Sequence, residues 1–114
     1  MLILRKIFDG WFYLVIAFIY IIALSSLSIL KHYNLHTFAY DLGIFMQSIW
    51  TTLNGGFFYE TPDLYWSKTG NFLSVHFSIL VFILLPIYYL LPYAETLLVF
   101  QSLLLGFSGI ILYK

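Results

Sequence analysis

Apolar residues are distributed along this chain in two different patterns. Three segments, residues 11–30, 72–91 and 97–113, are apolar at nearly every position. Between the first two, residues 39–56 carry apolar side chains at three- and four-residue spacing. A continuous apolar run is typical of a helix surrounded by lipid or core, whereas the spaced pattern predicts a helix with one apolar face. We therefore expect an all-α protein with three apolar helices and one amphipathic helix.

The three apolar segments have the length of membrane spans. Residues 11–30 and 72–91 each contain about 20 residues, roughly 30 Å as a helix, which matches the hydrocarbon thickness of a bilayer. Residues 97–113 are at the short end of this range. Pro86 falls late in the second span, and Pro92 marks a tight connection to the third. We expect three transmembrane helices, of which the last two form a hairpin.

The amphipathic segment predicts a helix that lies along the membrane surface in the first outward loop. Asp41 stands at the expected N-cap, and Gly55 and Gly56 end the helix. The predicted apolar stripe consists of Leu42, Phe45, Met46, Ile49, Trp50 and Leu53. The side chains expected to turn away from it, toward water or a substrate, are Gln47, Ser48, Thr51 and Asn54.

Composition supports a membrane setting. Hydrophobic residues make up 62% of the chain and charged residues only 9%, and the mean hydropathy is +0.95; a soluble domain carries about a quarter charged residues. The net charge of zero, without a basic cluster, excludes nucleic acid as a partner. The absence of Cys excludes disulfides, thiolate nucleophiles and Cys-based metal sites. We predict an integral protein of the cell membrane, and the sequence indicates no cofactor and no metal-ligating residues.

Charges near the spans predict an orientation. Arg5 and Lys6 precede the first span and favour a cytoplasmic N-terminus. Three spans would then place residues 31–71 outside, residues 92–96 in the cytoplasm and Lys114 at the outer face. The competing interpretation of the start is a cleaved signal peptide, because residues 23–25 resemble a cleavage site. The apolar run continues past them, which favours an uncleaved anchor.

The rest of the outward loop contains aromatic and polar residues together. Pro62 and Gly70 are turn signals, and we expect an ordered outer surface. Glu60 and Asp63 stand three residues apart, as a metal-binding pair does, but a solvated loop pair is the favoured interpretation. Lys68 either meets a lipid phosphate or only marks the interface.

Polar residues inside the second and third spans have two interpretations. His76 would lie about one turn inside the second span, where an ionisable residue is a functional hypothesis by default; its alternative is a hydrogen-bonded packing residue. In the third span, the residues with the spacing of a helix–helix contact are Gln101, Ser102, Gly106 and Gly109.

Three stretches of the chain resemble a known family in order and spacing. Residues 40–50, 56–59 and 71–78 are similar to the opening of the polytopic membrane family called domain of unknown function 2079. The resemblance runs from about Arg5 to Lys114 and covers only the amino-terminal part of a family member. It implies that residues 1–114 are one membrane domain within a longer multi-span domain. It also implies kinship with the C-type glycosyltransferases, which take sugars from polyprenyl phosphates.

The resemblance implies roles for individual residues. Asp41, at the start of a surface helix in the first outward loop, becomes the candidate general base. Gln47, Lys68 and His76 become candidate substrate-binding residues. The family often has an acidic residue at the position of Met46, so a two-carboxylate or metal scheme through that position is not expected here.

Two classes of function follow. The first is a fragment of a glycosyltransferase-C-like enzyme that acts on a polyprenyl-phosphate sugar at the outer membrane face, inactive without the remaining helices of a longer chain or other subunits. The alternative is a non-catalytic small membrane subunit or transporter-associated protein. Transporters place polar residues at mid-bilayer. Here polar residues collect in the outer loop, which favours the first class.

Overall fold

The regular elements of the protein are helices. A computed structural model describes residues 2–37 and 39–113, and their side chains at residues 10–37 and 40–112. Within these ranges the chain divides into two units. The first consists of Met1–Leu30 with Leu98–Lys114, and the second is Lys31–Leu97.

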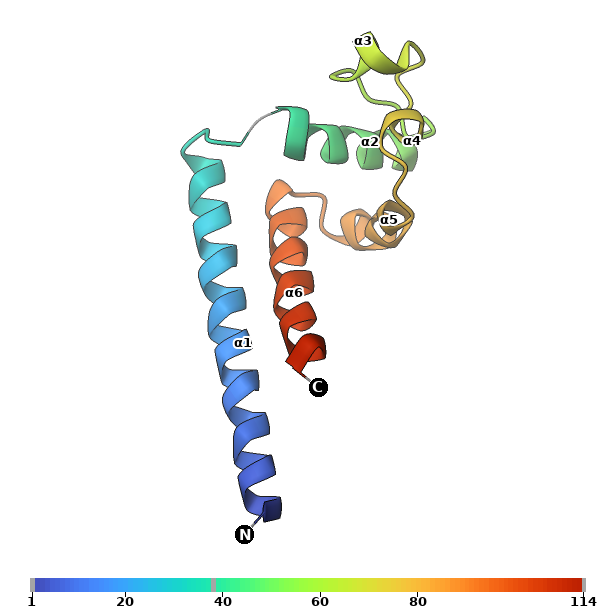
Figure 1. Ribbon diagram of the computed structural model, residues 1–114. Coiled ribbons are helices and arrows are strands. Elements are labelled where there is room, and N and C mark those ends of the chain that lie inside the picture. The colour runs from blue at the N-terminus through green and yellow to red at the C-terminus, as the bar shows by residue number, and fades with distance from the viewer. Residues whose placement is uncertain (1, 38, 114) are drawn as a thin grey trace. The chain divides into compact units, whose positions relative to one another are not determined.

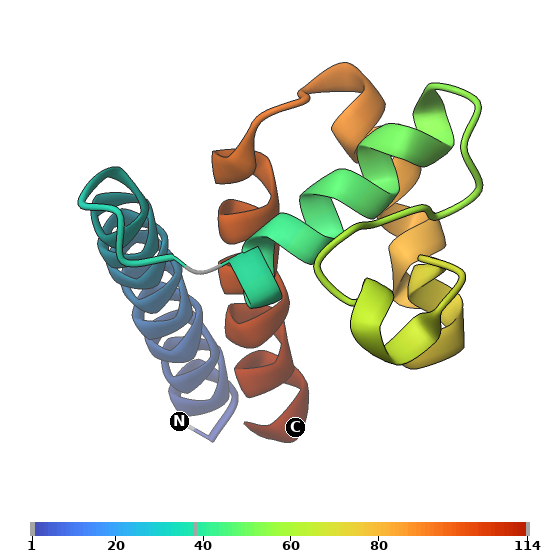
Figure 2. The same ribbon diagram turned by 90° about the horizontal axis from the view of Figure 1, so that it is seen from above.

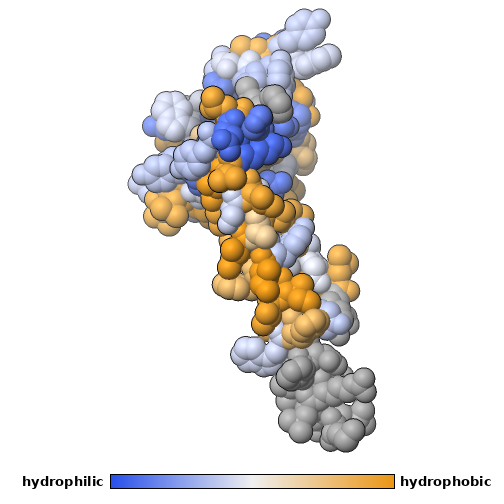
Figure 3. Space-filling model, turned by 90° about the vertical axis from the view of Figure 1, so that its left-hand side faces the viewer, coloured by the Kyte–Doolittle hydropathy of each residue, from blue (hydrophilic) through white to orange (hydrophobic). Residues whose placement is uncertain are grey.

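The first unit is formed by most of two long helices, α1 (Leu2–Tyr33) and α6 (Ala94–Tyr113), and the end of α1 and the start of α6 belong to the second unit. Their segments Gly10–Tyr33 and Ala94–Leu112 are long and apolar enough to cross a membrane. The first and third predicted spans are therefore confirmed as apolar helices. Figure 3 shows one face of the described part of α1, which is mostly apolar with some polar residues between. A helix that is apolar all round is suited to lipid contact.

Close packing between α1 and α6 depends on one glycine. The two helices run in opposite directions (Figure 1), and Gly106 of α6 is buried against Ile21 of α1. A Cβ at Gly106 would overlap the Ile21 side chain, whereas a Cβ at Gly109 would meet nothing within 4 Å. Gln101 is exposed. The predicted small-residue contact therefore depends on Gly106 rather than on Gly109.

The second predicted span is wrong as a single helix. Residues 72–91 form two short helices, α4 (Phe72–Val75) and α5 (Leu80–Leu90), separated by residues 76–79. α5 has 11 residues, about 16 Å of helix, half of what a bilayer core requires. In the described part of the chain, two helices rather than three meet the length and composition of a span.

The second unit is built around α2 (Ile44–Leu53), which packs on α5. Figure 2 shows α2 lying over α5. A π-helical turn, η1 (Ala39–Gly43), precedes α2, and a one-turn helix, α3 (Leu64–Ser67), lies in the following loop. The buried hydrophobic cluster of this unit consists of Ile44, Ile49, Phe58, Phe72, Val81, Tyr88 and Leu97.

α2 differs from the predicted amphipathic helix at its start and on its polar side. Asp41 is not its N-cap: that position is Gly43, and no side chain caps the helix. Ser48, predicted to face water, is fully buried and donates a hydrogen bond to the Ile44 carbonyl (2.6 Å). The predicted end is correct, because Asn54 is the C-cap and Gly55 follows with φ of +92°. The location of α2 along a membrane surface stays a prediction.

The loop after α2 closes on itself. Glu60 N donates to the Gly70 carbonyl (2.8 Å), and Phe72 N donates to the Phe58 carbonyl (2.8 Å). Gly70 has φ of +66°, and a Cβ there would overlap the Tyr59 ring, so a larger residue is excluded by backbone conformation and by space. Phe58 and Phe72 are fully buried beneath this closure. The loop therefore has internal hydrogen bonds and a buried aromatic pair, although Tyr65 and Trp66 remain exposed.

We predict that Gly106→Val lowers the thermal stability of the purified protein, because the new side chain must displace Ile21. Gly109→Val is the matched control, since its side chain enters open space on the same helix. The measurement is the apparent melting temperature in detergent, where a fall of several degrees is expected for Gly106→Val alone. Equal melting temperatures for the two variants would contradict this packing of α1 against α6.

Candidate functional site

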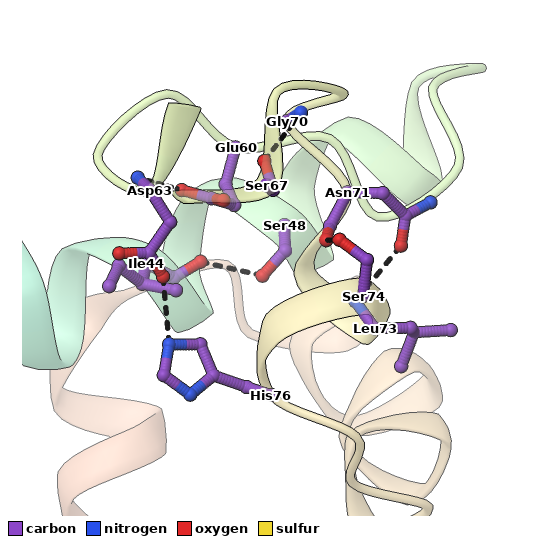
Figure 4. Close-up of polar contacts among 10 residues, drawn as sticks. All are labelled: Ile44, Ser48, Glu60, Asp63, Ser67, Gly70, Asn71, Leu73, Ser74 and His76. Carbon is purple, nitrogen blue, oxygen red and sulfur yellow. Dashed lines mark hydrogen bonds and ion pairs between the residues drawn. The ribbon is translucent and has the colours of Figure 1, made fainter. Parts of the chain in front are cut away.

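A buried carboxylate and a half-exposed imidazole form the main polar contact of the second unit. His76 Nε2 lies 2.7 Å from Asp63 Oδ2. The Asp63 side chain is 5% exposed and the His76 side chain is 48% exposed. Asp63 precedes α3 and His76 follows α4, so two separate turns supply the pair (Figure 4).

Glu60 supports this pair from within the loop. Its Oε2 accepts a hydrogen bond from the backbone N–H of Asp63 (2.8 Å), and the residue is fully buried. Its Oε1 is also buried and has no hydrogen-bond partner in the described chain. The favoured sequence interpretation of Glu60 and Asp63 as a solvated pair is therefore wrong. Loop closure between Glu60 N and the Gly70 carbonyl removes the pair from water.

His76 was predicted to lie inside a long apolar helix. The structure instead places it at the C-cap of the one-turn helix α4. Asn71 caps α4 by accepting a hydrogen bond from Leu73 N at its Oδ1 (2.9 Å). At the other end, His76 N donates to the Phe72 carbonyl (2.7 Å). The Phe72 and His76 rings lie 5.5 Å apart between centroids. These contacts place the imidazole toward Asp63.

The other two predicted substrate-binding residues have different surroundings. Gln47 is half-buried, and its Oε1 accepts hydrogen bonds from Thr61 N (3.1 Å) and Thr61 Oγ1 (3.0 Å). It joins α2 to the loop instead of facing open water as predicted. Lys68 is exposed at the end of α3, with φ of +55°. Among the described residues no ion pair involves Lys68.

Asp41 is exposed in η1. Within the ranges that the structure describes, its carboxylate has no hydrogen bond and no ion pair. The structure therefore brings Glu60, Asp63 and His76 together, and no polar contact links Asp41 or Lys68 to them.

The sequence interpretation missed this three-residue arrangement. A usable signal was present at the start of the second apolar segment, where polar residues recur among apolar ones at Asn71, Ser74, His76 and Ser78. Such a segment is poorly suited to lipid, because each polar side chain needs a partner there. The carboxylate partner itself lies 13 residues from His76.

The chemistry of the arrangement is that of an oriented imidazole. A carboxylate that binds one ring nitrogen selects the tautomer and leaves the other nitrogen for a ligand or a proton. No group of three or more His, Cys, Asp or Glu side chains that could hold a metal ion occurs in residues 10–37 and 40–112.

Comparison with known proteins gives one finding. A family described as "Predicted membrane protein (DUF2079)" matches residues 31–114, and the three motifs at residues 40–50, 56–59 and 71–78 lie within this range. The match begins later than the resemblance from Arg5 suggested. The comparisons with curated proteins and with solved structures gave no match.

We predict that Gln47→Leu loosens the loop between α2 and α3, because Thr61 loses the acceptor of two hydrogen bonds. Each net hydrogen bond contributes about 1 kcal/mol, so the loss of both should increase local opening roughly thirtyfold. The measurement is the rate of tryptic cleavage after the exposed Lys68. Gln101→Leu, at an exposed position of α6, is the control. An unchanged cleavage rate in Gln47→Leu would show that Gln47 does not hold the loop.

Proposed function

The chain belongs to the DUF2079 family of predicted membrane proteins, and on this premise we propose that it is a multi-pass membrane protein whose Lys31–Leu97 unit acts on a polyprenyl-phosphate-linked sugar. The family match supports the membrane setting. The sugar substrate comes from the resemblance to C-type glycosyltransferases.

The proposal includes a topology with two crossings. If α1 and α6 each cross once, the chain between them lies on one side of the membrane. The hydrogen bond from Tyr33 Oη to Glu95 Oε1 (2.6 Å) supports this arrangement, because it joins the end of α1 to the start of α6. Arg5 and Lys6, whose side chains lie outside the description, favour a cytoplasmic N-terminus and an outward second unit. The three-span topology predicted Lys114 at the outer membrane face, and this residue is not among those that the structure describes.

The observation that carries the catalytic part of the proposal is the state of Asp41. A general base must be ionised and free to accept a proton. The Asp41 carboxylate is exposed and takes no part in helix capping or in ion pairing with the described residues. In the proposed reaction it accepts the proton of an acceptor hydroxyl as that oxygen attacks the anomeric carbon. The sugar–phosphate bond breaks, and polyprenyl phosphate leaves with the electron pair.

The proposed site needs more surface than these residues provide. Catalytic groups act best within walls that exclude water and hold their rotamers. Asp41 and Lys68 are exposed, so the proposal assigns the missing walls to further helices of a longer chain or to other subunits. The proposal assigns the lipid phosphate to the exposed Lys68.

The topology predicts a labelling pattern, and the chain has no native Cys to interfere. Single cysteines at Ser67 and at the exposed Tyr93 should both react with an impermeant maleimide added to intact cells. A cysteine at Leu2 should react only after permeabilisation, which provides the control. Labelling at Ser67 without labelling at Tyr93 would contradict the topology with two crossings and support the one with three.

The catalytic role of Asp41 predicts a selective loss of activity. Asp41→Asn should lower sugar transfer from radiolabelled polyprenyl-phosphate mannose or glucose at least about a hundredfold, the usual contribution of a general base. Thermal stability should not change, because the Asp41 side chain makes no hydrogen bond in the described chain. The assay uses membranes that contain the whole protein as encoded, and Asp41→Glu, which retains a carboxylate, is the matched variant.

The outcomes separate the two classes of function. Full activity of Asp41→Asn would show that Asp41 is not the general base. An inactive wild-type protein with every sugar donor tested would favour the alternative, a non-catalytic membrane subunit.

A further inference from the structure

We infer that His76 Nδ1 binds a hydroxyl group of a sugar ligand, and that Asp63 and Glu60 are positioning residues that prepare the imidazole for this contact. The inference rests on the proposed function and deepens it by naming the group that recognises the sugar.

The tautomer of His76 follows from its partner. An ionised carboxylate can only accept hydrogen bonds, so the contact of 2.7 Å to Asp63 Oδ2 requires the proton on Nε2. In the neutral imidazole, Nδ1 then carries a lone pair and acts as an acceptor. A ligand hydroxyl is a suitable donor for this nitrogen.

Both partners of the pair are held by their backbones. The carbonyl of Asp63 accepts hydrogen bonds from Trp66 N and Ser67 N (2.9 Å each), and its N–H is bound by Glu60 Oε2. His76 N is bonded to the Phe72 carbonyl, and its ring lies beside the Phe72 ring. A group fixed in this way binds a ligand without a large loss of rotamer freedom.

Nδ1 is available to a ligand. The His76 side chain is 48% exposed, and no described residue forms a hydrogen bond with Nδ1. Figure 4 shows the imidazole at the edge of the cluster, with one side toward Asp63.

A second group in the same cluster also lacks a partner. Glu60 is fully buried, yet its Oε1 accepts no hydrogen bond in the described chain. Buried polar atoms in folded proteins are nearly always paired, so an unpaired carboxylate oxygen beside the Asp63–His76 pair points to a missing donor.

Charge distinguishes a sugar hydroxyl from a phosphate at this place. Two carboxyl groups, those of Glu60 and Asp63, stand against one imidazole. The negative charge of such a site disfavours the binding of an additional anion. A neutral hydroxyl group adds no charge, and it can donate a hydrogen bond to His76 Nδ1. The phosphate of a lipid-linked sugar therefore lies elsewhere.

The tautomer is tested first, by ¹⁵N NMR of histidine-labelled protein in nanodiscs. The chain has three histidines, and His36→Gln and His76→Gln assign the signals. The expected result is a proton on Nε2 of His76 and none on Nδ1, with this preference lost in Asp63→Asn and unchanged in His36→Gln. A proton on Nδ1 with a bare Nε2 in the wild type would overturn the inference even if Asp63→Asn did not fold.

The ligand is tested next, with a short-chain prenyl-phosphate mannose and the same prenyl phosphate without sugar. The sugar-bearing probe should shift the His76 Nδ1 resonance, and the sugarless probe should not. Equal shifts with both probes would assign the site to phosphate, and no shift with either would exclude a ligand contact; both results overturn the inference.

A transfer assay on the same samples separates this inference from the proposed function. If the wild type transfers sugar but the His76 Nδ1 resonance does not shift, the inference is wrong and the proposed function stands. A sugar-dependent shift of this resonance without sugar transfer would contradict the proposed enzymatic function. It would identify a sugar-binding membrane protein instead. In an active protein, His76→Gln should raise the KM at least tenfold with a smaller change in kcat, which a merely structural role would not produce.

Discussion

The second unit depends on the closure of the loop between α2 and α4. Two backbone hydrogen bonds, Glu60 N to the Gly70 carbonyl and Phe72 N to the Phe58 carbonyl, draw the ends of the loop together. The closed loop covers Phe58 and Phe72, which pack with Ile49 in one cluster. Thr52 Oγ1 of α2 accepts a hydrogen bond from Phe58 N (2.9 Å) and ties the loop to the helix. Burial of these side chains offsets the entropy lost when the loop is ordered.

Several features of the candidate site follow from this closure. It removes Glu60 and Asp63 from water, and it starts α4 at Phe72, one residue after the bridge between Tyr59 and Asn71. α4 ends at Val75, and the ring of its C-cap residue, His76, contacts Asp63. In an apolar chain, buried acidic groups are tolerated only with partners. Loop closure therefore determines the geometry of the site. Within the described chain, Glu60 Oε1 is the site oxygen that has no hydrogen-bond donor.

The sequence predicted the parts of the fold that local composition determines. The prediction of helices over residues 11–30 and 97–113 was correct, because an uninterrupted apolar run favours a helix both in lipid and in a protein core. The second span failed for the same reason: composition cannot distinguish lipid from a protein neighbour, and Phe72, Val81 and Tyr88 are buried within the second unit. The Asp63–His76 pair needed a contact across 13 residues, which periodicity does not report. Asp41 was predicted to be the N-cap of α2, but Gly43 occupies that position and Asp41 lies in η1.

Native-state hydrogen exchange of the whole protein in nanodiscs tests the loop closure most directly. The account predicts slow exchange at the amides of Phe58, Glu60 and Phe72, because each donates to an acceptor within the closed loop or α2. Amides in the same segment without such acceptors, at Tyr65 and Thr69, should exchange quickly and provide the internal reference. Fast exchange at all three closure amides would contradict the account, since an open loop could not hold Asp63 against His76.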